Sequence, residues 1–141
     1  MKIGLDSSFI IDLLARDAPR HAATLASFKR IRDGAEFVLC DHAILESFAV
    51  LSRSPKPVGM PAAQAERLML DNFPQVAIAP LRPGIGWEAI RHTLAHGYWG
   101  GRVYDTTIAL ATYEAGARLL ITWNAKHFHS IAPVGLEVRE P

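Results

Sequence analysis

Residues 100–128 read GGRVYDTTIALATYEAGARLLITWNAKHF, and this stretch decides the fold. A glycine turn is followed by one carboxylate, Asp105, and by a helix with an apolar face. A short strand then ends at Thr122, and a polar loop comes after it. In open α/β sheets, an acid at the start of a helix beside a strand that stops at a polar loop marks the edge where ligands bind. The stretch therefore predicts an α/β fold with its chemistry at that edge.

The rest of the chain repeats this alternation of short strands and helices. Strands are predicted at Lys2–Leu5, Phe37–Cys40, Val76–Ile78, Leu119–Thr122 and Leu136–Val138. Such alternation predicts a mainly parallel sheet covered on both faces by helices. Ser7 and Ser8 are expected to cap the first helix, and Asp41 the helix after the second strand. The proline-rich run from Arg53 to Pro61 separates two helices of the same domain.

Two helices carry apolar rows that predict their buried faces. Ile44, Phe48 and Leu51 form one row, and Glu46 points away from it. Trp87, Ile90 and Leu94 form the other, on a helix that begins at Pro83 and ends near Gly97. On the helices predicted at Ala62–Asn72 and Trp87–His96, a place in the core accounts for most of the apolar surface, and contact with a second chain is the alternative.

Composition limits the class of protein. With 141 residues, half of them apolar and about a fifth charged, the chain is expected to fold as a single domain over residues 1–141. It has no apolar run of about 20 residues and no signal-like N-terminus, so no membrane association is predicted. The lone Cys40 fits a reducing cytoplasm. A net charge of +1 neither requires nor excludes nucleic acid.

Three carboxylates far apart in the sequence are the candidate site. Asp6 ends the first strand, Asp105 begins a late helix, and Glu46 lies one to two turns into the helix after the second strand. Parallel strands bring such positions to one edge of the sheet, where the acids repel one another. Mg²⁺ or Mn²⁺ relieves that repulsion and supports phosphodiester hydrolysis. Taken singly, each acid also has a structural interpretation, as a helix start, an exposed helical residue or an N-cap.

The chain resembles a PIN domain of the VapC toxin-ribonuclease type in three segments. These are LDSSFIIDLL around Asp6, ILESFAVLSR around Glu46, and the stretch quoted above around Asp105. The resemblance implies a PIN-like three-layer α/β/α domain with a mainly parallel central sheet, and it implies that these three acids are the catalytic, metal-binding residues of a Mg²⁺- or Mn²⁺-dependent endoribonuclease. It also implies the toxin half of a VapBC type II toxin–antitoxin pair, with RNA as substrate, a cognate VapB-type antitoxin whose segment blocks the acidic groove, and a homodimer.

The loop after the fourth strand departs from the fullest form of this family pattern. Many PIN domains carry another Asp there, whereas Asn124 and His127 stand in its place, so the site keeps three acids and a second metal is not expected. Asn124 is a weak oxygen ligand at most. Ser8 and Thr122 are predicted to hold the carboxylates in orientation.

Arg102, Lys126 and His127 are the predicted substrate contacts, because they lie closest in sequence to the site. The His92 and His96 pair is interpreted as a solvated helix face. Two other functions stay open. One is a catalytically weak or inactive RNA-binding or regulatory module that keeps the fold, and the other is a metal-dependent phosphatase or DNA nuclease that uses the same acids.

Overall fold

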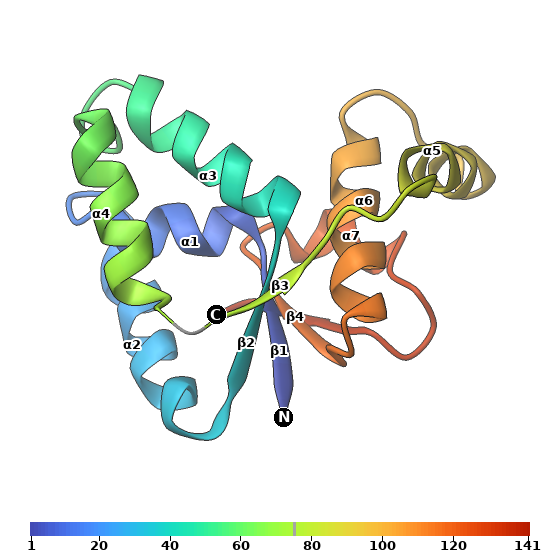
Figure 1. Cartoon of the computed structure of the whole chain (residues 1–141), viewed down its shortest axis with the longest axis horizontal. Coiled ribbons are helices and arrows are strands. Elements are labelled where there is room, and N and C mark those ends of the chain that lie inside the picture. Colours follow the sequence, from blue (N-terminus) through green and yellow to red (C-terminus); the bar gives the residue numbers. More distant parts are fainter. Residues whose placement is uncertain (75) are drawn as a thin grey trace.

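The computed structural model describes residues 1–74 and 76–141, which form a five-stranded sheet with helices on both faces (Figure 1). The strands are β1 (Lys2–Leu5), β2 (Glu36–Cys40), β3 (Ala77–Ala79), β4 (Leu119–Ile121) and β5 (Glu137–Arg139). The helices are α1 (Ser7–Leu14), α2 (His21–Ile31), α3 (Asp41–Arg53), α4 (Ala62–Asn72), α5 (Ile85–Ala95), α6 (Arg102–Glu114) and α7 (Ala125–His129), with a short 3-10 turn at Arg32–Gly34. In the part of the chain that the structure describes, none of these helices has the length and apolarity needed to cross a bilayer.

All strand pairs are parallel, and their order is β3-β2-β1-β4-β5. The chain runs outward from β1 to β3 and then returns to place β4 on the other side of β1. The direction of travel therefore reverses between β1 and β4. In open α/β sheets, the crevice at the carboxyl ends of two such strands is where ligands bind.

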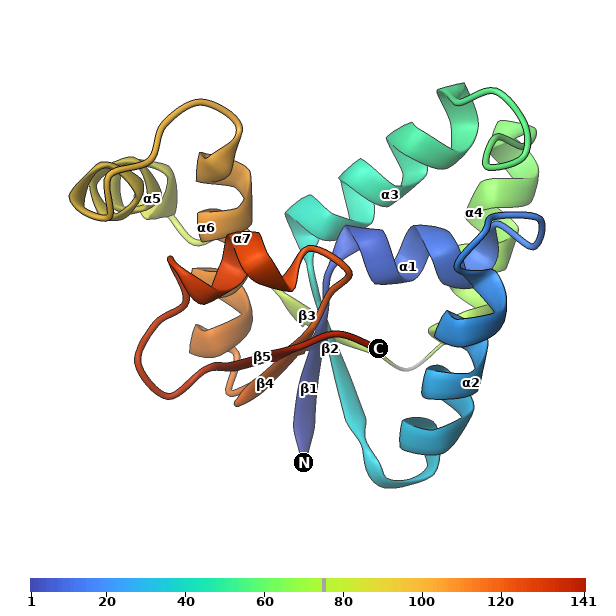
Figure 2. The ribbon, with the colours of Figure 1, turned by 180° about the vertical axis from the view of Figure 1, so that it is seen from behind.

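The helices divide into two layers. Figures 1 and 2 show α1 to α4 on one face of the sheet and α5 to α7 on the other. The contacts agree, since α1 packs on α2 and α3, whereas α6 packs on α5 and α7. The predicted α/β class, with a parallel sheet covered on both faces, is confirmed.

Gly4, in the middle of β1, allows α6 to pack closely on the sheet. A Cβ atom at this position would lie 2.1 Å from Cγ2 of Thr112, closer than real contacts allow. Both flanking residues of the strand, Ile3 and Leu5, are buried. The missing side chain thus fixes the distance between α6 and β1, and with it the position of the acid in the first turn of α6.

The helix starts differ from the sequence prediction. Asp6, not Ser7 or Ser8, is the N-cap of α1, and its side chain accepts a hydrogen bond from the backbone N–H of Ser8. Asp41 is the first residue of α3 rather than its cap, which is Cys40. An acid directly after a strand therefore serves as the cap when its carboxylate turns back over the helix start.

The buried faces of α3 and α5 also differ from the predicted ones. On α3, Leu51 is buried as predicted and Ile44 is partly buried against the core, but Phe48 is exposed and the other buried residues are the small Ala43 and Ser47, at a spacing of four. Small residues at this spacing let neighbouring helices approach, so the larger side chains turn outward.

On α5 the buried residues are Ile85, Ala89 and Thr93. The predicted core row is instead on the outside, with Trp87 72% exposed and Leu94 61% exposed. Trp99, just after the helix, is 76% exposed. The interpretation of this face as core is wrong, and α5 presents an apolar surface to solvent.

Candidate active site

Asp6 lies at the carboxyl end of β1, at the point where the strand order reverses, and is only 1% exposed. Its Oδ2 accepts hydrogen bonds from the hydroxyls of Thr122 at 2.7 Å and Ser8 at 2.8 Å. Burial raises the pKa of Asp6, and these hydrogen bonds oppose the rise because they favour the ionised form. The contacts match the role predicted for Ser8 and Thr122, which is to hold a carboxylate in orientation.

The hydroxyls of Ser8 and Thr122 also hydrogen-bond to the backbone of the loop that follows β4. Ser8 Oγ accepts a hydrogen bond from the backbone N–H of Trp123 at 3.0 Å, and Thr122 Oγ1 accepts one from that of Asn124 at 2.9 Å. Asn124 itself is exposed and precedes α7. The structure thus gives Asn124 a backbone role at the site, and the predicted weak ligation by its side chain stays a prediction.

Replacing Thr122 tests how much this network stabilises the fold. We expect Thr122→Val to lower the free energy of unfolding by about 1–3 kcal/mol, because it leaves a buried carboxylate oxygen with one hydrogen bond fewer. Thr122→Ser, which keeps the hydroxyl, is the matched control and should lose much less. Urea unfolding followed by circular dichroism measures both, and a loss for Thr122→Val no larger than that for Thr122→Ser would contradict the role given to the hydroxyl.

Glu46 reaches the same place from the second turn of α3. Ser7 Oγ lies 2.5 Å from Glu46 Oε1 and 3.3 Å from Asp6 Oδ1, so one hydroxyl links the two acids. The other carboxylate oxygen, Oε2, lies 3.2 Å from Nε2 of His42. Ser7 and His42 therefore hold Glu46 on both oxygens. From the sequence, Ser7 was expected only as a helix cap and not as a partner of Glu46, and its position next to Asp6 was the available signal.

Asp105 is the third acid, in the first turn of α6. Burial first, and then the negative charge of Asp6, raise the pKa of Asp105 to about 7, and Glu46 adds to the rise. The positive charge of Arg102 opposes it. The charges of Asp6 and Glu46 both act on the pKa of Asp105, so the three acids lie within electrostatic reach of one another, and their convergence on one metal ion stays a prediction.

Two side chains that carry basic nitrogens lie near Asp105. Arg102 Nε lies 3.7 Å and His127 Nδ1 3.8 Å from Asp105 Oδ2. The Arg102 guanidinium also lies over the ring of Tyr98, 4.1 Å from its centroid, and its Nη2 donates to the backbone oxygen of His127 and to Ser130 Oγ. Arg102 thus joins α6 to α7, while Lys126 and His127 remain exposed on α7.

The donor set suits a hard divalent cation. Within residues 1–74 and 76–141, no three His, Cys, Asp or Glu side chains are close enough to form a ready-made metal cluster. The negative charges of Asp6 and Glu46 nevertheless make the ionised form of Asp105 costly, and the Asp105 carboxylate accepts no hydrogen bond from the described residues, so its lone pairs are open. Carboxylate oxygens in this situation are the ligands that Mg²⁺ and Mn²⁺ prefer. The donor chemistry of Asp6, Glu46 and Asp105 therefore fits such an ion, although their side chains do not yet form a closed set of ligands.

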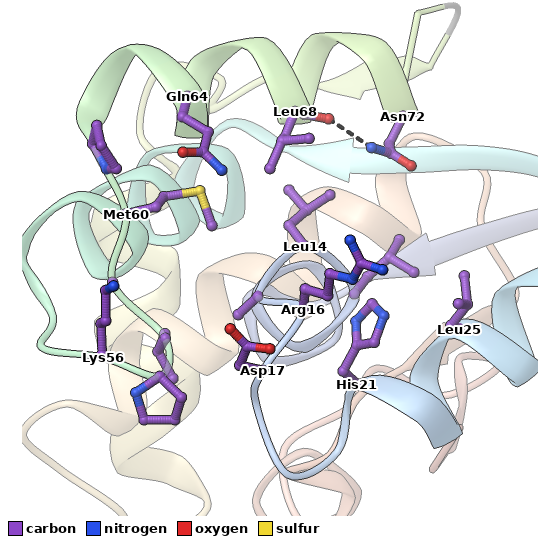
Figure 3. Close-up of a pocket in the computed structure, with 16 residues that line it drawn as sticks. Leu14, Arg16, Asp17, His21, Leu25, Lys56, Met60, Gln64, Leu68 and Asn72 are labelled. Atoms are coloured by element: carbon purple, nitrogen blue, oxygen red, sulfur yellow. Dashed lines mark hydrogen bonds between the residues drawn. The ribbon is translucent and has the colours of Figure 1, made fainter.

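Two other features lie apart from the acids. A cavity of about 560 Å³ opens between α1, α2 and α4, and Leu14, Leu68, Arg16 and Lys56 are among the residues that line it (Figure 3).

His92 and His96 were predicted to form a solvated helix face, and this is only partly correct. His92 is half-buried, and its Nε2 lies 2.8 Å from the backbone oxygen of Ile131. His92 therefore docks α5 against the segment after α7.

Comparison with known proteins places this geometry in a family. The family model described as "PIN domain" matches residues 3–132. Ribonuclease VapC27 of Mycobacterium tuberculosis is 31% identical over 137 residues, which cover 96% of this chain and 94% of that protein.

Two solved structures share the fold. The crystal structure of VapBC2 from Rickettsia felis bound to a DNA fragment from its promoter matches with a TM-score of 0.72 at 15% identity, over all of this chain and 99% of that one. Mycobacterium tuberculosis VapC20, described as a sarcin-ricin loop cleaving toxin, matches with a TM-score of 0.69 at 14% identity, over 91% of this chain and 94% of that one. At these identities the two structures establish the similarity of the fold.

Proposed function

The chain belongs to the PIN-domain family and, within it, to the VapC toxin ribonucleases, and from that premise we propose that it is a Mg²⁺- or Mn²⁺-dependent endoribonuclease and the toxin half of a VapBC type II pair. One observation supports this proposal above the others: Ser7 links Asp6 and Glu46 at the carboxyl edge of the sheet, where the strand order reverses, and the charges of both acids act on Asp105. We place the activity in the cytoplasm, where RNA is available and a lone thiol such as Cys40 stays reduced.

In this proposal each acid has its own supporting groups. Asp6 would hold the ion with its orientation fixed by Ser8 and Thr122, and Glu46 with its orientation fixed by Ser7 and His42. When bound, the ion supplies Lewis-acid chemistry, since it stabilises negative charge on a phosphate and lowers the pKa of water in the site.

Asp105 completes the set of ligands, and its neighbours prepare the approach of the substrate. The positive charge of Arg102 favours the ionised form of Asp105 that a metal requires. Lys126 and His127, exposed beside it on α7, would bind the phosphate backbone, and Arg102 would contribute its charge to the same contact. These contacts would keep the scissile phosphate next to the three acids.

Substrate choice tests the proposal. The protein is incubated with Mg²⁺ or Mn²⁺ and with a structured RNA, single-stranded DNA or a small phosphoester. Internal cleavage of RNA alone, abolished by EDTA and restored by added metal, is the expected result. Hydrolysis of DNA or of the small phosphoester in preference to RNA would support the phosphatase or DNA-nuclease alternative, whereas tight RNA binding without cleavage under any metal would support the RNA-binding module.

The VapC family also implies a VapB-type antitoxin as partner. The cavity between α1, α2 and α4 supports such a contact, because its lining combines apolar side chains with two basic residues, Arg16 and Lys56, against one acid, Asp17 (Figure 3). An antitoxin segment with apolar side chains and nearby acids is complementary to it. We propose that this segment continues into the acidic groove and blocks it.

The exposed face of α5 is the surface we propose for a homodimer. Trp87, Ile90, Leu94 and Trp99 together present a continuous apolar surface, which in a soluble protein marks a contact site. Large aromatic and aliphatic side chains of this kind supply most of the binding energy in protein interfaces.

Substitutions on this face test the dimer. We expect Trp87→Glu or Leu94→Glu to weaken the dimer by about 30-fold or more, because each buries a charge where an apolar side chain had been. Val134→Glu, at a loop residue that is 97% exposed, is the matched control and should leave the dimer intact. Light scattering after size exclusion measures the mass, and a wild type that is monomeric at all concentrations would contradict the proposal.

A further inference from the structure

Two stacked rings stand at the border of the acidic site. Tyr104 of α6 and His42 of α3 lie with ring centroids 4.9 Å apart and planes only 7° from parallel. Tyr104 is 54% exposed, so His42 covers one side of its ring and much of the remainder faces solvent. An aromatic ring in this situation gains little from the core, which leaves its open face available to a ligand.

The stacked pair is joined directly to two of the three acids. Tyr104 precedes Asp105 in the first turn of α6. His42 Nε2 lies 3.2 Å from Glu46 Oε2, so the ring that supports Tyr104 is itself held by the site. The position of the Tyr104 ring is therefore fixed relative to the acids by two helices.

Tyr104 differs from three other large aromatic residues. An arginine guanidinium stacks in a cation–π contact on the ring of each of these residues. Its central carbon lies 4.1 Å from the ring centroid of Tyr98, 4.9 Å from that of Trp123 and 4.5 Å from that of Tyr113. Within residues 1–74 and 76–141, no Lys or Arg covers the Tyr104 ring in this way. Its open face can therefore accept another planar group without displacing an intramolecular partner.

We propose that the open face of Tyr104 is the platform on which one nucleobase of single-stranded RNA stacks, beside the phosphate that is cleaved. The inference rests on the proposed ribonuclease function and adds a base-binding subsite to it. Unpaired bases stack on Tyr and His rings in many RNA-binding proteins, and every base offers a face for this contact. Tyr104 then binds the base, while His127 and Lys126 on α7 bind the backbone.

The test uses a short single-stranded RNA with one 2-aminopurine, whose fluorescence falls when the base stacks. Binding is measured in EDTA, so that no cleavage occurs. Tyr104→Ala and Tyr104→Leu should bind this RNA about 5- to 100-fold more weakly than the wild type, whereas Tyr104→Phe should bind it as the wild type does. The 2-aminopurine signal should fall with the wild type and Tyr104→Phe and stay unchanged with the two non-aromatic variants.

An abasic ribose–phosphate oligomer separates stacking from charge. The wild type and Tyr104→Ala should bind it equally, whereas Lys126→Ala should weaken binding of both oligomers. Thermal unfolding confirms that each variant is folded, and Tyr104→Leu retains apolar bulk over His42 if Tyr104→Ala does not fold. Undiminished binding of the base-containing RNA by folded Tyr104→Leu would overturn the platform alone. A wild type that neither binds nor cleaves RNA would overturn the proposed function together with it.

Discussion

Asp6→Asn and Asp105→Asn are each expected to lower the rate of RNA cleavage by about 10²- to 10⁴-fold while the protein stays folded. Each change replaces a charged oxygen ligand by a neutral amide that binds Mg²⁺ or Mn²⁺ weakly. Asn keeps the size of Asp and can still accept the hydrogen bonds of Ser8 and Thr122 at position 6. Single-turnover cleavage of a labelled RNA at saturating metal measures the loss.

Asp12→Asn is the matched control for these variants. Asp12 lies on α1 and burial also raises its pKa, but the charges that act on it are those of Arg20 and His21 rather than of the three acids. Its replacement should leave the cleavage rate close to that of the wild type. A loss as large for Asp12→Asn as for Asp6→Asn would show that general damage to the fold, not loss of a ligand, reduces activity.

Although Asp105→Asn is expected to reduce activity, we expect it to increase stability. It should raise the free energy of unfolding of the metal-free protein by about 1–3 kcal/mol at pH 8. The pKa of Asp105 is about 7 in the folded state and 3.8 in the reference state. The folded state therefore binds more protons than the unfolded state between about pH 4 and pH 7, and wild-type stability falls as the pH rises through this window. Above pH 7 the cost is fully present, and the neutral Asn removes it.

Thermal unfolding at pH 8 and pH 5 in EDTA measures this effect. The stabilisation by Asp105→Asn should be largest at pH 8 and much smaller at pH 5, where wild-type Asp105 is already protonated when folded. Added Mn²⁺ should raise the melting temperature of the wild type and not that of the variant, because only the wild type keeps all three ligands. A variant less stable than the wild type at pH 8 would contradict the proposed repulsion among the acids.

Much of the fold followed from local patterns. The short apolar runs that end at Asp6 and Thr122 predicted parallel strands, and the sheet edge brought these two residues within 2.7 Å of each other. The order of the three acids in the chain predicted the family, which the comparisons confirm. The strand predictions succeeded because an apolar run and the polar residue that ends it are local features of the sequence.

What the sequence did not predict depends on contacts between distant elements. The distance between α5 and α6 decides whether Trp87 or Ala89 of α5 faces the protein core. When two helices pack closely, small side chains such as that of Ala89 occupy the interface. The stacking of His42 on Tyr104 joins two helices 62 positions apart in the chain, which no local pattern reveals. Helix α7 was expected as a loop, and it forms because Phe128 is completely buried.

Anomalous diffraction from a crystal of the protein grown with Mn²⁺ shows whether the three acids share one metal ion. The account predicts one strong peak among the carboxylates of Asp6, Glu46 and Asp105, next to the ends of β1 and β4. The peak should vanish in Asp105→Asn crystals grown in the same way. A manganese ion found elsewhere on the molecule at saturating Mn²⁺, with only solvent around these three carboxylates, would contradict the proposed shared metal site.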